Sequence, residues 1–131
     1  NGYEVVHTIL LPDDRKMLTE EMARIADAKM VELIVTTGGT GFSPRDCMPE
    51  ATKDIVEREV PGIPEAMRAY SMTITPRAML SRAAAGIRKG TLIVNLPGSP
   101  KAVRESLEYI IPALEHGLQI LTGEAANCAR K

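Results

Sequence analysis

Short and almost continuous apolar runs alternate along this chain with segments whose apolar residues recur at helical spacing. Three runs rich in β-branched residues predict buried strands, over residues 3–11, 31–36 and 91–96. Helical spacing, with Ser, Asp and Pro at capping and first-turn positions, predicts helices over residues 13–28, 49–58, 63–72, 75–85 and 99–111. We expect Pro112 to end or kink the last helix, and Gly86 and Gly90 to bracket a tight turn before the third strand.

Apolar strands separated by helices are typical of parallel sheets that are covered on both faces. The pattern therefore predicts an α/β sandwich with a mostly parallel sheet, and the length of 131 residues fits a single domain over residues 1–131. Ligands of such sheets bind outside the carboxyl ends of the strands. Three loops leave the predicted strand ends, at residues 12–14, 37–46 and 97–100, and they are the first places to look for a site.

A glycine-rich turn, TTGGTG, occupies residues 36–41 directly after the second predicted strand. Glycine reaches positive φ and lets backbone amides converge on an anion, and the threonines add hydroxyl donors. The turn is not a Walker A loop, because no Gly-Lys-Ser/Thr follows. It also lacks the third glycine of the dinucleotide fingerprint, and Pro44 interrupts the expected helix. The turn predicts an anion site, with a tight loop that binds nothing as the alternative.

A second turn, PGSP at residues 97–100, follows the third predicted strand. Ser99 can cap the next helix, whose free amides suit a phosphate group. An ordinary capped helix is the alternative for this turn alone. Two such turns at the same edge of one sheet favour a site for phosphate or for a polar heterocycle.

Two aspartates stand in the loops that leave the strand ends. Asp13 and Asp46 would repel a bound phosphate unless Mg²⁺ lay between them, which is how this cation joins carboxylates to phosphate oxygens. Asp13 could instead cap a helix, whereas Asp46 has no obvious capping role. Other candidates are weaker: neither histidine (His7, His116) has a partner at metal or triad spacing, and Cys47 lacks a paired histidine.

Composition and charge exclude several classes of function. With 16 basic and 17 acidic residues, no Trp and one Phe, the chain has neither the basic excess nor the aromatic platforms of a nucleic-acid-binding protein. No apolar run approaches the roughly 20 residues of a membrane span. Two cysteines, Cys47 and Cys128, cannot form a disulfide framework, so we expect a cytoplasmic protein. The basic residues concentrate in residues 66–131, where no acid stands between Glu65 and Glu105, and they predict an anion-facing surface or solvated helix faces.

Three segments resemble the molybdopterin-binding domain family, which includes MogA-type and MoaB-type cofactor-biosynthesis proteins and the G domains of plant Cnx and animal gephyrin. They are TTGGTGFSPRDCMPEAT (36–52), LSRAAAGIRKGTLIVNLPGSPKAVRE (80–105) and, more weakly, LLPDD (10–14). The resemblance implies a three-layer α/β fold, a homotrimer or hexamer, and Mg²⁺-dependent transfer of AMP from ATP to the terminal phosphate of molybdopterin. Pyrophosphate is the other product.

The resemblance also implies residue roles. Asp46 matches the family's essential aspartate and Asp13 the aspartate after its second strand, and we expect both to hold Mg²⁺ or to position the attacking phosphate. The positions that match its ligand-binding turn and pocket-closing segments are Thr37, Gly38, Gly39, Thr40, Gly41, Ser81, Arg82, Asn95, Pro97, Gly98 and Ser99.

Alternatives remain at this point. The chain could be a non-catalytic trimeric module that holds molybdopterin or a nucleotide, or a molybdenum-insertion or CinA-type enzyme of the same fold. Those enzymes usually have an acid before the loop aspartate, and Arg45 here favours the adenylyltransferase type. Family members also begin with a further strand, a Ser-Asp turn and a helix ahead of the segment at residue 3. We therefore expect this chain to be a fragment, whose apolar sheet edge would be exposed without that strand.

Overall fold

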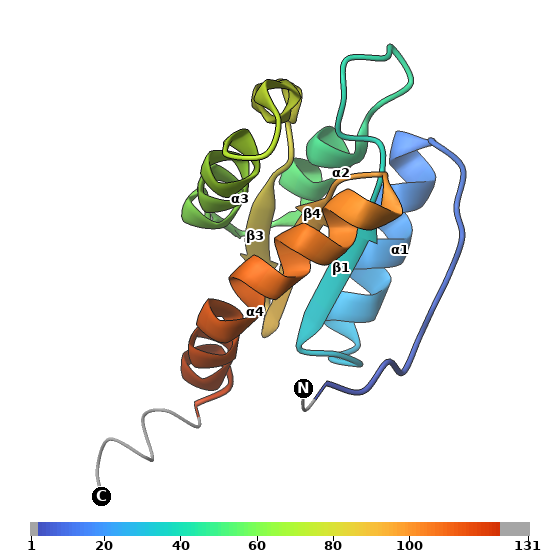
Figure 1. Ribbon diagram of the computed structural model, residues 1–131. Helices are drawn as coiled ribbons and strands as arrows, with labels where there is room; N and C mark the ends of the chain where they lie inside the picture. Colours follow the sequence, from blue (N-terminus) through green and yellow to red (C-terminus); the bar gives the residue numbers. More distant parts are fainter. Residues whose placement is uncertain (1–2, 124–131) are drawn as a thin grey trace, which may run out of the picture.

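The computed structural model describes residues 3–123, which form a sheet with helices packed on both of its faces (Figure 1). Cys128 lies outside the described residues. In chain order the elements are α1 (Arg15–Asp27), β1 (Leu33–Thr37), α2 (Met48–Ile55), β2 (Arg58–Glu59), α3 (Gly62–Met72), the 3-10 helix η1 (Pro76–Leu80), β3 (Ala85–Arg88), β4 (Thr91–Leu96) and α4 (Pro100–Thr122). The predicted α/β fold class is confirmed.

The sheet has the strand order β1-β4-β3-β2. β1 runs parallel to β4, whereas the β4–β3 and β3–β2 pairs are antiparallel. The described sheet is therefore mixed, whereas a mostly parallel sheet was predicted. The prediction was wrong on this point because the sequence pattern did not reveal β2 and β3. A turn of two residues, Lys89 and Gly90, joins β3 to β4, and Lys89 has a φ of 54°. So short a connection permits only antiparallel pairing.

Side chains of β4 alternate between the two helical layers. Leu92, Val94 and Leu96 pack against α3 and α4, and Ile93 packs against α1 and α2 on the opposite face. Figure 1 shows the same three layers, with α3 and α4 on one side of the strands and α1 and α2 on the other. All six residues of β4 are buried.

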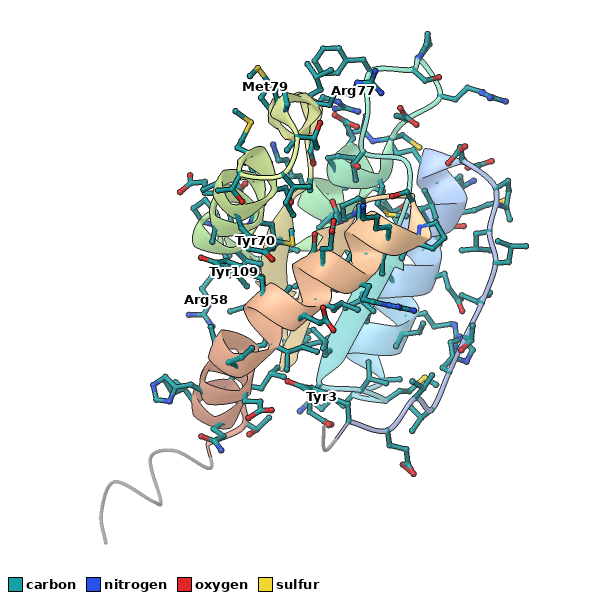
Figure 2. All side chains as sticks on the ribbon, in the orientation of Figure 1. Tyr3, Arg58, Tyr70, Arg77, Met79 and Tyr109 are labelled. Carbon is teal, nitrogen blue, oxygen red and sulfur yellow. The ribbon has the colours of Figure 1, made fainter. Side chains whose placement is uncertain are left out.

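Aromatic stacking joins the two helices of one layer. The rings of Tyr70 on α3 and Tyr109 on α4 stack with their centroids 4.3 Å apart and their planes inclined by 8° (Figure 2). Stacked pairs add to the stability that comes from apolar burial alone.

Residues 3–11 do not form the predicted strand. They run past the outer side of α1 without pairing to the sheet (Figure 1), and Val5 and Leu10 are 82% and 96% exposed. A strand is stabilised by a neighbour that pairs with its backbone. No such neighbour lies beside residues 3–11 in the described part of the chain, so the prediction from composition is wrong here.

Three helix boundaries also differ from expectation. α4 continues through Pro112 to Thr122 and ends at Gly123, whose φ is 90°. Proline removes one amide donor from a helix but does not always end it when the helix is packed on both sides of the proline. α2 ends at Ile55 because Val56 is extended and leads into β2. The helix predicted over residues 75–85 is only η1, since Ser81 is extended and residues 81–84 lead into β3 without helical structure.

Candidate functional site

The two predicted glycine turns lie against each other. β1 and β4 end level, with Thr37 opposite Leu96, so both turns leave the same edge of the sheet. The Gly38 amide donates to the Leu96 carbonyl at 3.2 Å. A Cβ built on Gly98 would lie 3.5 Å from the Cα of Gly38. Backbone therefore faces backbone here, and the Gly38 amide is used to join the two turns.

Gly38 and Gly39 require the left-handed region of φ, at 84° and 72°. Only glycine adopts it without strain. A Cβ on Gly39 would meet the Cβ of Met48 at 3.2 Å and Oδ1 of Asp13 at 3.6 Å. The turn is thus enclosed between the start of α2 and the Asp13 carboxylate, and a side chain at Gly39 would press on Met48.

Asp13 is not the cap of α1. Its neighbour Asp14 takes that role, because the Met17 amide donates to Asp14 Oδ1 at 3.0 Å. The capping role that the sequence left open for Asp13 is therefore filled by Asp14. The carboxylate of Asp13 lies against the Gly39 turn instead.

The side chain of Asp46 lies against the glycine turn, and its loop is closed by hydrogen bonds between Ser43 and Asp46. The Ser43 amide donates to Asp46 Oδ2 at 3.0 Å, and the Asp46 amide donates to the Ser43 carbonyl at 2.9 Å. A Cβ on Gly41 would come within 2.9 Å of Asp46 Oδ2, so only glycine allows the carboxylate to lie this close. The structure therefore brings Asp13, Asp46 and both glycine turns to one edge of the sheet, as expected; their chemical roles stay predictions.

The guanidinium of Arg82 donates hydrogen bonds to the loop over residues 41–46. Nε donates to the Gly41 carbonyl at 2.7 Å, Nη2 donates to the Asp46 carbonyl at 2.9 Å, and Nη1 pairs with Glu50 on α2. The main-chain amide of Arg82 also donates to the Thr40 carbonyl at 2.8 Å. The Arg82 guanidinium lowers the pKa of the Glu50 carboxyl, so the pair stays charged at neutral pH. Glu50 was not identified from the sequence, which offered no pattern linking it to Arg82.

Asn95 does not face the ligand space as predicted. Its side chain is completely buried, and every group is used inside the protein. Oδ1 accepts from the Ala84 amide at 3.0 Å, and Nδ2 donates to the hydroxyls of Thr36 and Thr52 at 3.0 and 2.9 Å. The prediction that Asn95 contacts a ligand directly is therefore wrong. Its hydrogen bonds instead join β1, α2 and the residue that precedes β3.

Ser99 begins α4 as predicted. Its Oγ accepts from the Ala102 amide at 3.2 Å, and the helix then runs for 23 residues. The N-terminus of a helix carries partial positive charge, and here it stands beside the turn at Gly98. Anionic groups at this edge would therefore meet amides from a turn and the start of a helix.

A cavity of about 300 Å³ adjoins the turns. Four of the predicted site residues line it, namely Thr40, Gly41, Ser81 and Pro97. Apolar groups of Met67, Ile74 and Leu80 share its wall with Arg68 and Arg77, which lie in the acid-free stretch of the sequence. Figure 2 shows Arg77 on η1, and it lines the same cavity as Gly41. The buried hydroxyl of Ser106 on α4 also borders the cavity and has no hydrogen-bond partner among the described residues.

Thr37 and Gly98 face a different hollow. This second space, of about 550 Å³, is open and runs along α4 beside Arg104. The predicted residues that line a hollow are thus divided between the two, and Gly38 and Gly39 line neither.

Asp13 and Asp46 are ligands of the kind with which Mg²⁺ binds when substrate phosphates complete its coordination. Residues 3–123 hold no cluster of three or more His, Cys, Asp or Glu side chains that could bind a metal. Mg²⁺ usually binds through one or two carboxylates together with water and substrate phosphates, so it does not require such a cluster. Asp13 and Asp46, on either side of the glycine turn, fit that donor set.

Groups with other chemistry are poorly placed for it. Burial raises the pKa of the Cys47 thiol, with nearby Asp13 adding to the effect, which disfavours the thiolate. His7 lies 3.5 Å from Glu21 beside α1, away from the turns. Within residues 3–123, no helix is long and apolar enough to cross a membrane.

Comparisons with known proteins agree with this geometry. Residues 1–116 match the family model described as "Probable molybdopterin binding domain". The molybdopterin adenylyltransferase of Helicobacter pylori strain J99 is 42% identical over 117 residues, which cover 89% of this chain and 66% of the relative. That of Escherichia coli K12 is 43% identical over 105 residues, covering 80% and 54%. The solved structure of the molybdopterin biosynthesis enzyme MoaB from Thermus thermophilus is 50% identical with a TM-score of 0.86, covering 92% of this chain and 76% of that one.

This chain spans between half and two thirds of the length of the two adenylyltransferases. The matched range includes both glycine turns, both carboxylates and Arg82. The resemblance found in the sequence is confirmed: this chain belongs to the family described as "Probable molybdopterin binding domain".

Proposed function

We propose that this domain adenylylates molybdopterin, transferring AMP from ATP to the terminal phosphate of the pterin and releasing pyrophosphate. The main support is the convergence of Gly39, Asp46 and Gly98 at the carboxyl ends of β1 and β4, next to a cavity. Relatives at 42% and 43% identity carry the name molybdopterin adenylyltransferase. The cytoplasmic location expected from the two cysteines stays a prediction.

The two parts of the site suit the two parts of such substrates. The Gly39 amide and the amides at the start of α4 would hold phosphate oxygens. The neighbouring cavity, of about 300 Å³ with mixed apolar and polar walls, is at the lower end of the size range of small-molecule sites and suits an organic ring system.

The reaction needs positioning and charge neutralisation more than a protein nucleophile. An oxygen of the pterin phosphate bonds to the α-phosphorus of ATP, the bond to the bridging oxygen breaks, and pyrophosphate leaves with that oxygen. A phosphate monoester with a second pKa of about 6 is already ionised at neutral pH, so no strong general base is required. Mg²⁺, when held by Asp13 and Asp46, would neutralise charge on the phosphates. The residues of the turns would align the two reacting groups.

Replacement of Asp46 tests this proposal. We expect Asp46→Asn to lower the rate of molybdopterin-dependent pyrophosphate release about 10²-fold, because the site loses one of the two carboxylates that would hold Mg²⁺ at the phosphates. The matched control is Asp54→Asn on the surface of α2, where the carboxylate pairs with Arg15. Pyrophosphate release and the mass of adenylyl-molybdopterin report the activity. Full activity in Asp46→Asn, or equal losses in both variants, would contradict the assignment.

A binding module without catalysis is the second candidate. The same arrangement of turn amides, carboxylates and an adjoining cavity would serve ligand binding without turnover. Titration calorimetry with ATP and Mg²⁺ followed by the pyrophosphate assay separates the two functions, since a module would bind its ligands without turnover.

We also propose that the chain assembles as a homotrimer. One group of exposed apolar side chains lies in the stretch from the end of α3 through η1, where Met72, Ile74, Met79 and Leu80 are between 39% and 60% exposed. Met79 projects outward from η1 in Figure 2. Such exposure favours contact with another protein surface. Light scattering should give the mass of three copies; the mass of one copy would refute the trimer, and that of six would indicate a hexamer.

A further inference from the structure

The residues that lead into β3 are anchored from several sides. Arg68 on α3 donates through Nη1 to the carbonyls of Ser81 and Ala83, at 3.3 and 3.2 Å. The buried side chain of Asn95 accepts from the Ala84 amide, and the Asn95 amide donates to the Ala84 carbonyl. Residues 81–84 are therefore fixed to α3 on one side and to β4 on the other.

The loop over residues 41–46 has little support of its own. It projects from the edge of the sheet (Figure 1), and residues 42–45 are exposed. Its internal hydrogen bonds join Ser43 to Asp46 and to Arg45, which shape the loop but do not attach it to the core. A loop held only by local bonds at the surface samples many positions.

Arg82 connects these two regions. Its backbone belongs to the anchored segment, and its Nε and Nη2 donate to the carbonyls of Gly41 and Asp46, the first and last residues of the loop. Both ends of the loop are thereby fixed to one planar group. Glu50 at the first turn of α2 holds the third nitrogen.

We infer that Arg82 is a positioning residue that fixes the Asp46 carboxylate at the glycine turn, rather than a group that binds the substrate through its charge. All three guanidinium nitrogens are engaged within the protein, and the charge of Arg82 is paired with Glu50. This inference rests on the proposed function for its catalytic consequence, while its structural part concerns the loop alone.

The first experiment separates geometry from charge. Arg82→Met and Arg82→Lys are compared with wild type in the adenylylation assay. We expect kcat to fall about 10- to 10²-fold in both, because small displacements of a catalytic group have effects of this size, while KM for ATP changes less than about threefold. Lysine keeps the charge but cannot form the three bonds of a guanidinium fork. Recovery of kcat in Arg82→Lys, or a rise of KM alone, would overturn the inference.

Arg88→Met is the matched control. Arg88 also donates three hydrogen bonds, two to Asp27 and one to the Ile55 carbonyl, and its side chain is 24% exposed against 33% for Arg82. It lies at the far end of β3, so its loss weakens the fold without reaching the loop. We expect Arg88→Met to keep the wild-type kcat at temperatures below its unfolding transition. An equal loss of kcat in this variant would mean that the effect of Arg82 is only structural.

Hydrogen exchange gives a readout that does not depend on activity. In Arg82→Met, the peptide over residues 41–47 should lose protection, including the Ser43 amide that donates to Asp46, while β4 stays protected. Methylguanidinium added to Arg82→Ala should restore part of both protection and kcat. Unchanged exchange in the loop would refute the inference. If exchange changes as expected but wild type itself makes no adenylyl-molybdopterin, the proposed function fails while the role of Arg82 in holding the loop stands.

Discussion

β4 and residues 3–11 are similar in composition, but only β4 forms a strand of the sheet. Both are runs of Val, Ile and Leu with a few polar residues. β4 lies between β1 and β3, and all of its residues are buried. Residues 3–11 pair with no strand in the described part of the chain, and Leu10 is 96% exposed. The comparison shows that composition makes a segment able to form a strand, but partners on its edges decide whether it does.

The largest expected effect comes from truncating the same residue type in both regions. Leu96→Ala should lower the free energy of unfolding by about 3 kcal/mol, because Leu96 is completely buried and its loss leaves a cavity. Leu10→Ala should change it by less than about 0.5 kcal/mol. Chemical denaturation measures both. A large loss in Leu10→Ala would mean that residues 3–11 are buried in solution, and the contrast drawn here would fail.

The polar residues of the two regions provide a second test. Asn95→Ala leaves the Ala84 amide and the hydroxyls of Thr36 and Thr52 without their buried partner, and should destabilise the protein by about 2 kcal/mol. His7→Ala removes only a 3.5 Å contact with Glu21 at the surface and should have an effect near zero. Denaturation of both variants at pH 7 measures the difference. Equal losses would contradict the structural role given to Asn95.

The smallest expected effect is a pH dependence at α1. A hydrogen bond from Arg24 lowers the pKa of Glu21 from its ordinary 4.5, with a further contribution from His7. Because the folded pKa lies below the unfolded one, this stabilisation is present at neutral pH and is lost as the pH falls below about 4.5 and through the folded value. Urea unfolding at pH 7 and pH 3.5 should show a smaller acid-induced shift in Glu21→Gln than in wild type. An identical shift in both would refute this.

Much of the fold was predictable because local signals and packing agree. The almost continuous apolar run TLIVNL is typical of a strand buried on both faces, as β4 is, and its bounds were predicted correctly. α1 and α3 also lie where capping residues and helical spacing placed them. β2 and β3 were not predictable, because β2 has two residues and β3 reads as a glycine-containing turn. At Gly86 the segment between α2 and β2 approaches so closely that an added Cβ would meet the Cβ of Val56 at 2.7 Å, a contact that no local pattern reveals.

The candidate site was predictable where it consists of backbone and loops. The glycines and Asp46 sit in motifs whose chemistry can be read directly, and their proximity follows from the parallel pairing of β1 with β4. The inward direction of Asn95 could not be predicted from the motif that contains it. Neither could the bond of Arg82 to a loop 36 to 41 residues away in sequence, which depends on tertiary packing.

Asn95 also determines how β4 aligns with β1. Successive side chains of a strand point to opposite faces of the sheet. A shift of β4 by two residues along β1 would therefore keep each apolar side chain of β4 in its own layer, at little energetic penalty. That slip would move the Asn95 amide by about 7 Å, opposite Ile34 instead of Thr36, and leave it without its acceptors. A single polar side chain in the middle of the sheet thus disfavours the nearest misaligned register, in which the two glycine turns would no longer leave the sheet at the same level.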